Sequence, residues 1–136
     1  MGVLAAVFAI KKVIKLFKQI PAKTTVKDAK TELNKEINYN PLSFTESQYK
    51  MWADSIETAI FDIGTDNKAI YSIFVKMNNK ADVLSLIVAF GVRPLYDWFV
   101  HIGDWNLGQW LHYDMRQSQI DKINTILSNK DINYSF

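Results

Sequence analysis

The sequence predicts an all-α fold, in which five or six short helices form a single bundle preceded by an N-terminal amphipathic helical arm. Apolar residues recur at spacings of three and four through most of the chain, which is typical of helices with one buried face. No stretch shows the alternation of apolar and polar residues that marks a half-buried strand. The 136 residues, of which 49% are hydrophobic and 22% charged, match one globular domain in length and composition.

Residues 2–20 are predicted to form the first helix of the arm, because apolar side chains recur there at helical spacing. Four lysines follow in its second half, and no acidic residue balances them. The apolar run ends at Ile10, so it is too short to span a bilayer. The apolar stripe contains Leu4, Val7, Phe8, Ile10, Ile14 and Phe17, and the basic rim contains Lys11, Lys12, Lys15 and Lys18.

We expect this stripe to dock on another protein, with the lysine charges at the rim of the contact. Two alternatives stay open from composition alone. One is a helix that lies on a membrane surface, and the other is an arm that binds nucleic acid or another anion.

A second amphipathic helix is expected after Pro21, with Thr24 or Thr25 as its N-cap and Val26, Ala29, Leu33 and Ile37 along its narrow apolar stripe. Residues 38–41 (NYNP) form a clear break, so we divide the chain into an arm (residues 1–40) and a domain (residues 41–136). Charge follows a similar division. Residues 1–36 hold eight lysines and three acids, which gives +5, whereas residues 37–136 give −3.

The domain is predicted to begin with a helix that starts at one of two overlapping capping boxes, at Ser43 or Thr45, and runs to Asp62. The next helix is expected to end at Asn78 and Asn79, and the one after it at Gly91. Further helices are predicted over residues 94–102, 106–115 and 118–127, with a turn at residues 103–104. Gly64 is expected to take a left-handed conformation, after which Thr65 or Asp66 caps the next helix. Tyr134 and Phe136 in the tail are expected to fold back onto the domain. The predicted core contains Trp52, Ile60, Ile70, Phe74, Leu84, Ile87, Leu111 and Ile123.

The sequence shows no pattern typical of catalysis, so we expect no enzyme activity, no catalytic residue and no cofactor. His101 and His112 lie beside aromatic clusters, where packing or surface roles are common, and neither accompanies a nucleophile elbow. The absence of cysteine excludes thiolate metal sites and disulfides. Because the domain is net negative, we expect it not to bind nucleic acid itself.

Residues 63–66 (IGTD), followed by Ala69 and Ile70, resemble the loop between the first two helices of an annexin repeat, although Asp62 replaces the first loop glycine. Residues 79–82 (NKAD), 89–93 (AFGVR) and 132–136 (INYSF) are similar to an annexin-like variant. That variant occurs in Bacteroidota and in their tailed phages, including the crAss-like group. The resemblance covers roughly the last two-thirds of the chain.

This resemblance implies a structural or assembly component of a phage virion, such as a capsid, neck or tail accessory protein. Its arm would dock on a larger virion protein, in several copies within a symmetric assembly. The alternative is a peripheral membrane or cell-envelope binding protein, cytoplasmic or membrane-associated, that uses the basic arm; a hydrolase ranks last.

The resemblance also implies a candidate calcium site, because annexin loops bind calcium through backbone carbonyls and a carboxylate about forty residues later. Gly64, Thr65 and Asp104 are the weak candidates here. Asp62 in place of the glycine argues against that loop shape, so we expect no metal and interpret the loop as a helix break and cap.

Overall fold

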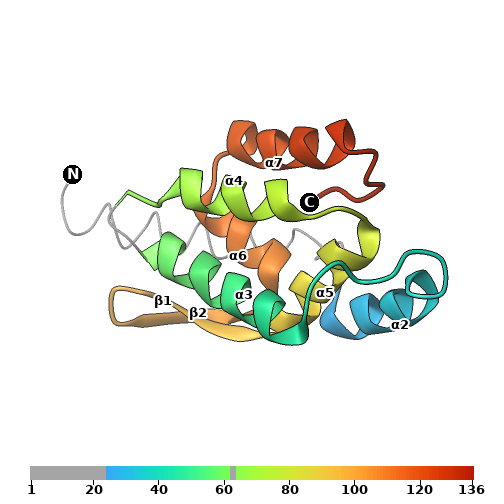
Figure 1. The fold of residues 1–136 in the computed structure, drawn as a ribbon. Helices are drawn as coiled ribbons and strands as arrows, with labels where there is room; N and C mark the ends of the chain where they lie inside the picture. The colour runs from blue at the N-terminus through green and yellow to red at the C-terminus, as the bar shows by residue number, and fades with distance from the viewer. Residues whose placement is uncertain (1–23, 62–63) are drawn as a thin grey trace.

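A computed structural model describes residues 24–61 and 64–136, and the predicted stripe and basic rim of the arm lie outside them. The described part contains six helices and one two-stranded antiparallel sheet (Figure 1). The prediction of a mostly helical fold is therefore confirmed, whereas the strict all-α class is wrong. The elements are α2 (Val26–Glu36), α3 (Glu46–Phe61), α4 (Asn67–Lys76), α5 (Lys80–Phe90), β1 (Arg93–Asp97), β2 (Val100–Trp105), α6 (Leu107–Asp114) and α7 (Gln117–Asn129).

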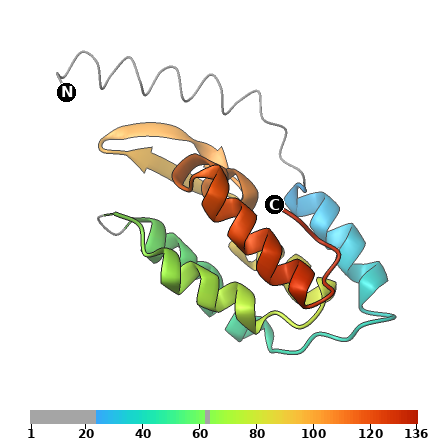
Figure 2. The same ribbon diagram turned by 90° about the horizontal axis from the view of Figure 1, so that it is seen from above.

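The helices surround one hydrophobic core. Helix α5 contacts both α2 and α3, and α4 contacts both α3 and α7, so segments distant in sequence lie side by side (Figures 1 and 2). All eight predicted core residues are buried in a single cluster, which confirms the predicted helix faces. Other fully buried side chains include Tyr49, Ile56, Met77, Leu86, Phe90, Leu107 and Trp110.

Side-chain caps set the helix starts largely as the sequence predicts. Thr25, Asp66, Asn79 and Asn106 each accept a hydrogen bond from a backbone N–H in the first turn of α2, α4, α5 and α6. These bonds satisfy donors that have no partner within the helix. Gly64 has φ of +83° and Gly91 has φ of +63°, so both glycines take the left-handed backbone region expected where a helix is broken.

Residues 93–105 form a hairpin, so the helix predicted over residues 94–102 and the turn predicted at 103–104 are wrong. Strand β1 pairs with β2 in antiparallel register from Arg93 opposite Trp105 to Asp97 opposite Val100. The reversal occurs at Trp98, which has φ of +58°, and Phe99. The segment is rich in aromatic and β-branched residues, which favour a strand. The register shifts between Leu95 and Tyr96. Because of this irregularity, apolar and polar residues do not alternate strictly along the two strands, and the sequence lacks the usual strand pattern.

Helix α2 packs against α5, and its Ala29 is fully buried. Lys80 at the start of α5 forms an ion pair of 2.8 Å with Glu32 of α2. The division between arm and domain at residue 40 stays a prediction. Helix α2 belongs to the arm by that division, and it contacts helix α5 of the domain.

The C-terminal tail folds back as predicted. Phe136 is only 4% exposed, and its ring centroid lies 5.3 Å from that of Phe74. The side chain of Asn124 in α7 accepts from the Phe136 N–H at 2.7 Å and donates to the Phe136 carbonyl at 3.0 Å. The Tyr134 hydroxyl donates to Oγ1 of Thr24 at 2.9 Å, so the tail also reaches the start of α2.

Candidate interaction site

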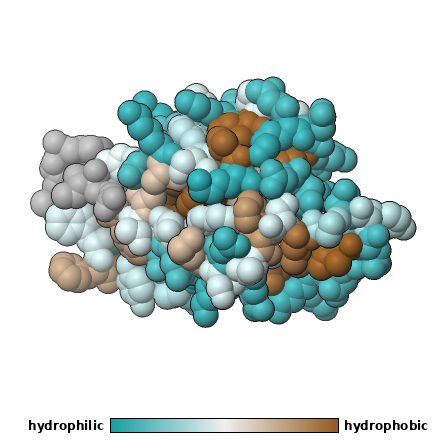
Figure 3. All heavy atoms as spheres, in the orientation of Figure 1, coloured by the Kyte–Doolittle hydropathy of each residue, from teal (hydrophilic) through white to brown (hydrophobic). Residues whose placement is uncertain are grey.

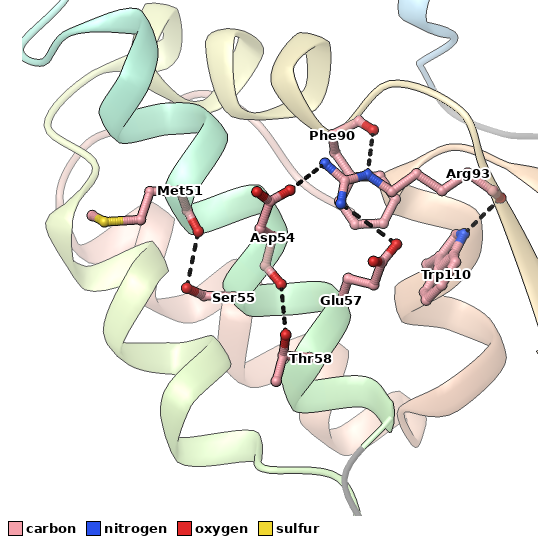
Figure 4. A network of polar contacts seen from close by, with 8 residues as sticks. All are labelled: Met51, Asp54, Ser55, Glu57, Thr58, Phe90, Arg93 and Trp110. Atoms are coloured by element: carbon pink, nitrogen blue, oxygen red, sulfur yellow. Dashed lines mark hydrogen bonds and ion pairs between the residues drawn. The ribbon is translucent and has the colours of Figure 1, made fainter.

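Arg93 fixes the hairpin to the helices (Figure 4). Its Nε donates to the Phe90 carbonyl at 2.8 Å, and its guanidinium carbon lies 4.6 Å from the centroid of the Phe90 ring. The guanidinium also pairs with Asp54 at 2.9 Å and Glu57 at 3.4 Å, both on α3. The indole N–H of Trp110 donates to the Arg93 carbonyl at 3.2 Å. One residue therefore joins α3, the end of α5, β1 and α6.

A shallow groove of about 560 Å³ runs along the outer face of α3 towards α4. Two of its hydroxyl groups are already used within the helix, because Ser55 donates to the Met51 carbonyl and Thr58 to the Asp54 carbonyl (Figure 4). No histidine is among its described lining residues. The lining residues are Ser47, Lys50, Met51, Asp54, Ser55, Thr58, Ala59, Asp66 and Ala69.

The turn of the hairpin presents bulky apolar side chains to solvent. Phe99 is 96% exposed and Trp98 is 86% exposed, and Tyr96 and Val100 are about half exposed. Figure 3 shows hydrophobic atoms at the end of the molecule where the hairpin projects. Side chains of this size are usually covered when they cluster on a surface, so the turn is a candidate contact surface.

A hollow of about 530 Å³ lies beside this turn, and we call it the hairpin hollow. Its wall combines the end of α3, strand β1 with the turn, and the end of α6. Aromatic rings and aliphatic side chains form most of the wall, and two carboxyl groups interrupt it. The lining residues are Ile60, Phe61, Leu95, Tyr96, Asp97, Trp98, Tyr113 and Asp114.

Hydrogen bonds hold both carboxyl groups in place. The Tyr113 hydroxyl donates to Oδ2 of Asp97 at 2.9 Å, and the Thr65 hydroxyl donates to Oδ2 of Asp114. Burial raises the pKa of Asp114, and the hydrogen bond from Thr65 partly opposes that shift. Burial and the neighbouring Asp97 raise the pKa of Tyr113, so its hydroxyl stays protonated and remains a donor at neutral pH.

The three weak calcium candidates are not brought together by the hydrogen bonds of the structure. Thr65 pairs with Asp114, whereas Asp104 on β2 pairs with His101 at 3.1 Å. Gly64 has the positive φ that the sequence predicted, and Thr65 follows with φ of +44°. Within residues 24–61 and 64–136, no group of three or more His, Cys, Asp or Glu side chains is placed to hold a metal ion.

Neither histidine lines the groove along α3 or the hairpin hollow. His101 is exposed on β2, and His112 lies half-buried in the last turn of α6. The prediction of no catalytic residue stays a prediction.

Sequence reasoning missed the hairpin hollow as a site. Asp114 and Thr65 lie 49 positions apart, and folding alone brings them together. Tyr113 and Asp97 lie 16 positions apart, in segments expected to belong to two separate helices. The run from Tyr96 to Val100 was the available signal, because it concentrates aromatic residues that a packed helix of that length cannot all bury.

Among the described residues, no helix combines the length and apolarity needed to cross a bilayer. Comparison with family models, with curated proteins and with solved structures gives no match to this chain.

Proposed function

We propose that this chain is a structural component of a larger protein assembly, which it joins by docking residues 2–20 on a partner protein. The resemblance to annexin-like phage proteins favours a virion as that assembly, with the chain as a capsid, neck or tail accessory protein in several copies. This role makes use of the apolar stripe and the basic rim of the arm, and it requires no catalytic centre.

The observation that carries the proposal is that Thr24 and Thr25, which follow the predicted docking segment, are held by hydrogen bonds. Oγ1 of Thr24 accepts a hydrogen bond from Tyr134 at 2.9 Å, and Oγ1 of Thr25 accepts from the Asp28 N–H at 3.1 Å to cap α2. Helix α2 in turn packs on α5. When the residues next to a docking segment are already ordered, less conformational entropy is lost on binding. The body is then also held in a defined orientation relative to the partner.

The distribution of charge supports the same role. Residues 1–23 contain five lysines and no acid, which gives +5, whereas residues 24–136 contain eleven basic and fourteen acidic residues, which gives −3. Residues 1–23 therefore attract negatively charged surfaces, whereas the rest of the chain favours positively charged ones.

The test is incorporation into particles. The chain should be found by mass spectrometry in purified particles from a phage that encodes it. Deletion of residues 2–20, or Val7→Asp with Ile14→Asp, should abolish incorporation while circular dichroism shows a folded, soluble chain. Lys→Gln changes at residues 11, 12, 15 and 18 should weaken incorporation mildly and mainly at low salt, because rim charges are screened.

The membrane alternative gives the opposite pattern in the same variants. Vesicles of phosphatidylglycerol and phosphatidylcholine should leave the full chain in the supernatant if the arm docks on protein. Salt-sensitive pelleting that the Lys→Gln changes abolish, together with the absence of the wild-type chain from purified particles, would replace the assembly role with peripheral membrane binding.

A further inference from the structure

The hairpin hollow has the chemistry of a site for a cation on an apolar stem. Trp98, Tyr96 and Phe61 supply aromatic surface, and Asp97 and Asp114 supply carboxyl oxygens. None of the eight lining residues in the described part of the chain is Lys or Arg, so none of them supplies a cation to neutralise these carboxyl groups. A lysine side chain fits such a wall, because its methylene stem covers a ring while its ammonium group reaches a carboxylate.

The exposed turn extends this surface beyond the hollow. Trp98 both lines the hollow and is 86% exposed, and the adjacent Phe99 is almost fully exposed. Trp98 also has φ of +58°, a conformation uncommon for a bulky residue. Aromatic residues with exposed faces are the side chains that most often anchor protein interfaces.

The chain itself contains a segment with the complementary pattern. Within residues 2–20, four lysines accompany the apolar stripe and no acidic residue is present. In the predicted helix, Lys11, Lys15 and Lys18 share one face at spacings of four and three, and this face continues the side of the stripe that carries Leu4 and Phe8. This segment can therefore offer both apolar side chains to the rings and ammonium groups to the two carboxyl groups.

We propose that the hairpin hollow and the exposed turn are the docking site for residues 2–20 of a second copy of this chain. The inference rests on the proposed function, in which the arm docks on a protein, and it identifies that protein surface. Helix α2, which follows the arm, and the hairpin lie on opposite sides of the body in the ribbon views (Figures 1 and 2). An arm of one copy in the hollow of another joins two different surfaces. Contacts between copies are then head-to-tail, and a head-to-tail contact builds a ring or a filament.

The experiment mixes two full-length variants that are each defective on one side of the contact. The arm variant carries Val7→Asp and Ile14→Asp, and the hollow variant carries Trp98→Ala and Phe99→Ala. The substitutions in the hollow variant change exposed side chains, so they leave the fold intact. Tyr39→Ala is the matched control, because Tyr39 is an aromatic residue that is 82% exposed but does not line the hollow.

Sedimentation velocity gives the readout. Wild type and Tyr39→Ala should associate into oligomers as concentration rises, whereas each defective variant alone should stay monomeric, with affinity lowered at least about tenfold. An equimolar mixture of the two defective variants should form a dimer and nothing larger, since it contains one intact arm and one intact hollow per pair.

Carbodiimide cross-linking of mixed ¹⁵N-labelled and unlabelled wild type checks the geometry. The expected products join a lysine of residues 11–18 to Asp97 or Asp114 of the differently labelled chain. Cross-links confined to one label, in a wild type that stays monomeric, would show that the arm folds onto its own hollow and would overturn the proposal.

The remaining outcomes separate this inference from the proposed function. If the hollow variant associates as strongly as wild type, the inference is overturned. If the arm variant alone then fails to join particles, the proposed function stands and the arm has a different partner. Normal incorporation of the arm variant into particles overturns both.

Discussion

The hydroxyl of Tyr49 donates to Oδ1 of Asp82 at 2.5 Å, and both side chains are fully buried. The same carboxylate accepts from the Ser43 N–H at 2.9 Å and, through Oδ2, from the Asn78 N–H at 2.8 Å. One buried acid therefore joins the chain before α3, helix α3 itself and the α4–α5 connection. A carboxylate without water is costly unless its oxygens accept hydrogen bonds, and here both oxygens do.

Asp82→Ala should lower the free energy of unfolding by about 3 kcal/mol or more, because one buried donor and two part-buried donors lose their acceptor together. Tyr49→Phe removes one of these donors and keeps the ring, so it should cost about 1–2 kcal/mol. Urea denaturation followed by circular dichroism measures both values. A loss at Asp82 no larger than the loss at Tyr49 would contradict the role of the carboxylate as the common acceptor.

Phe74→Ala should cost about 3–5 kcal/mol, since Phe74 is fully buried and its ring packs against that of Phe136. The adjacent Val75 is 53% exposed on the same helix, so Val75→Ala should stay within about 0.5 kcal/mol of wild type. The two variants differ in burial far more than in position. Similar stabilities in thermal or urea unfolding would mean that the buried face of α4 is wrongly assigned.

Two glycine-to-alanine changes should have opposite signs. Gly64→Ala should destabilise the domain by about 1 kcal/mol, because alanine disfavours the φ of +83° even though nothing lies within 4 Å of the added Cβ. Gly108→Ala lies inside α6, where the nearest atom to an added Cβ is 3.5 Å away, so it should stabilise by about 0.5–1 kcal/mol. Differential scanning calorimetry checks both, and a destabilising Gly108→Ala would contradict the assigned helix.

The helices could be predicted from the sequence because their signals are local. Asp66 and Asn106 cap helices through bonds to residues three positions away, and Leu84 and Ile87 share one face by spacing alone. The hairpin could not be predicted in this way. Gly103 resembled part of a turn, but an added Cβ there would lie 2.5 Å from the indole nitrogen of Trp105, so the glycine makes room for a ring.

The hairpin hollow was unpredictable for a different reason. Its polar groups meet through tertiary contacts between Thr65 and Asp114 and between Asp97 and Tyr113, and no spacing rule connects these pairs. The arm remains a sequence prediction, since residues 2–20 lie outside the described part of the chain.

The stability of the fold should depend on pH through Asp114. Burial raises its folded-state pKa above the unfolded value of about 3.9, so the folded chain binds more protons between these two values. This contribution to stability is present at lower pH and is lost as the pH rises through the folded pKa. Asp114→Asn should remove it, so the variant should gain stability relative to wild type as the pH rises from about 3.5 to 7.

Thr65→Val provides the control for that pH effect. The Thr65 hydrogen bond lowers the pKa of Asp114, so its loss should raise that pKa further and steepen the fall in stability with rising pH. Urea unfolding at a series of pH values gives both curves. Parallel curves for wild type and Asp114→Asn would show that this carboxyl group does not titrate differently on folding.

The hairpin also bears on how the chain folds in time. Two residues connect β1 and β2, so this pair can form within about 1–10 μs, whereas the α2–α5 and α4–α7 pairs require the closure of much longer loops. Trp98 and Phe99 are therefore displayed on a chain whose helices have not yet assembled. Refolding yield should consequently fall with chain concentration, and the Trp98→Ala and Phe99→Ala changes should restore it.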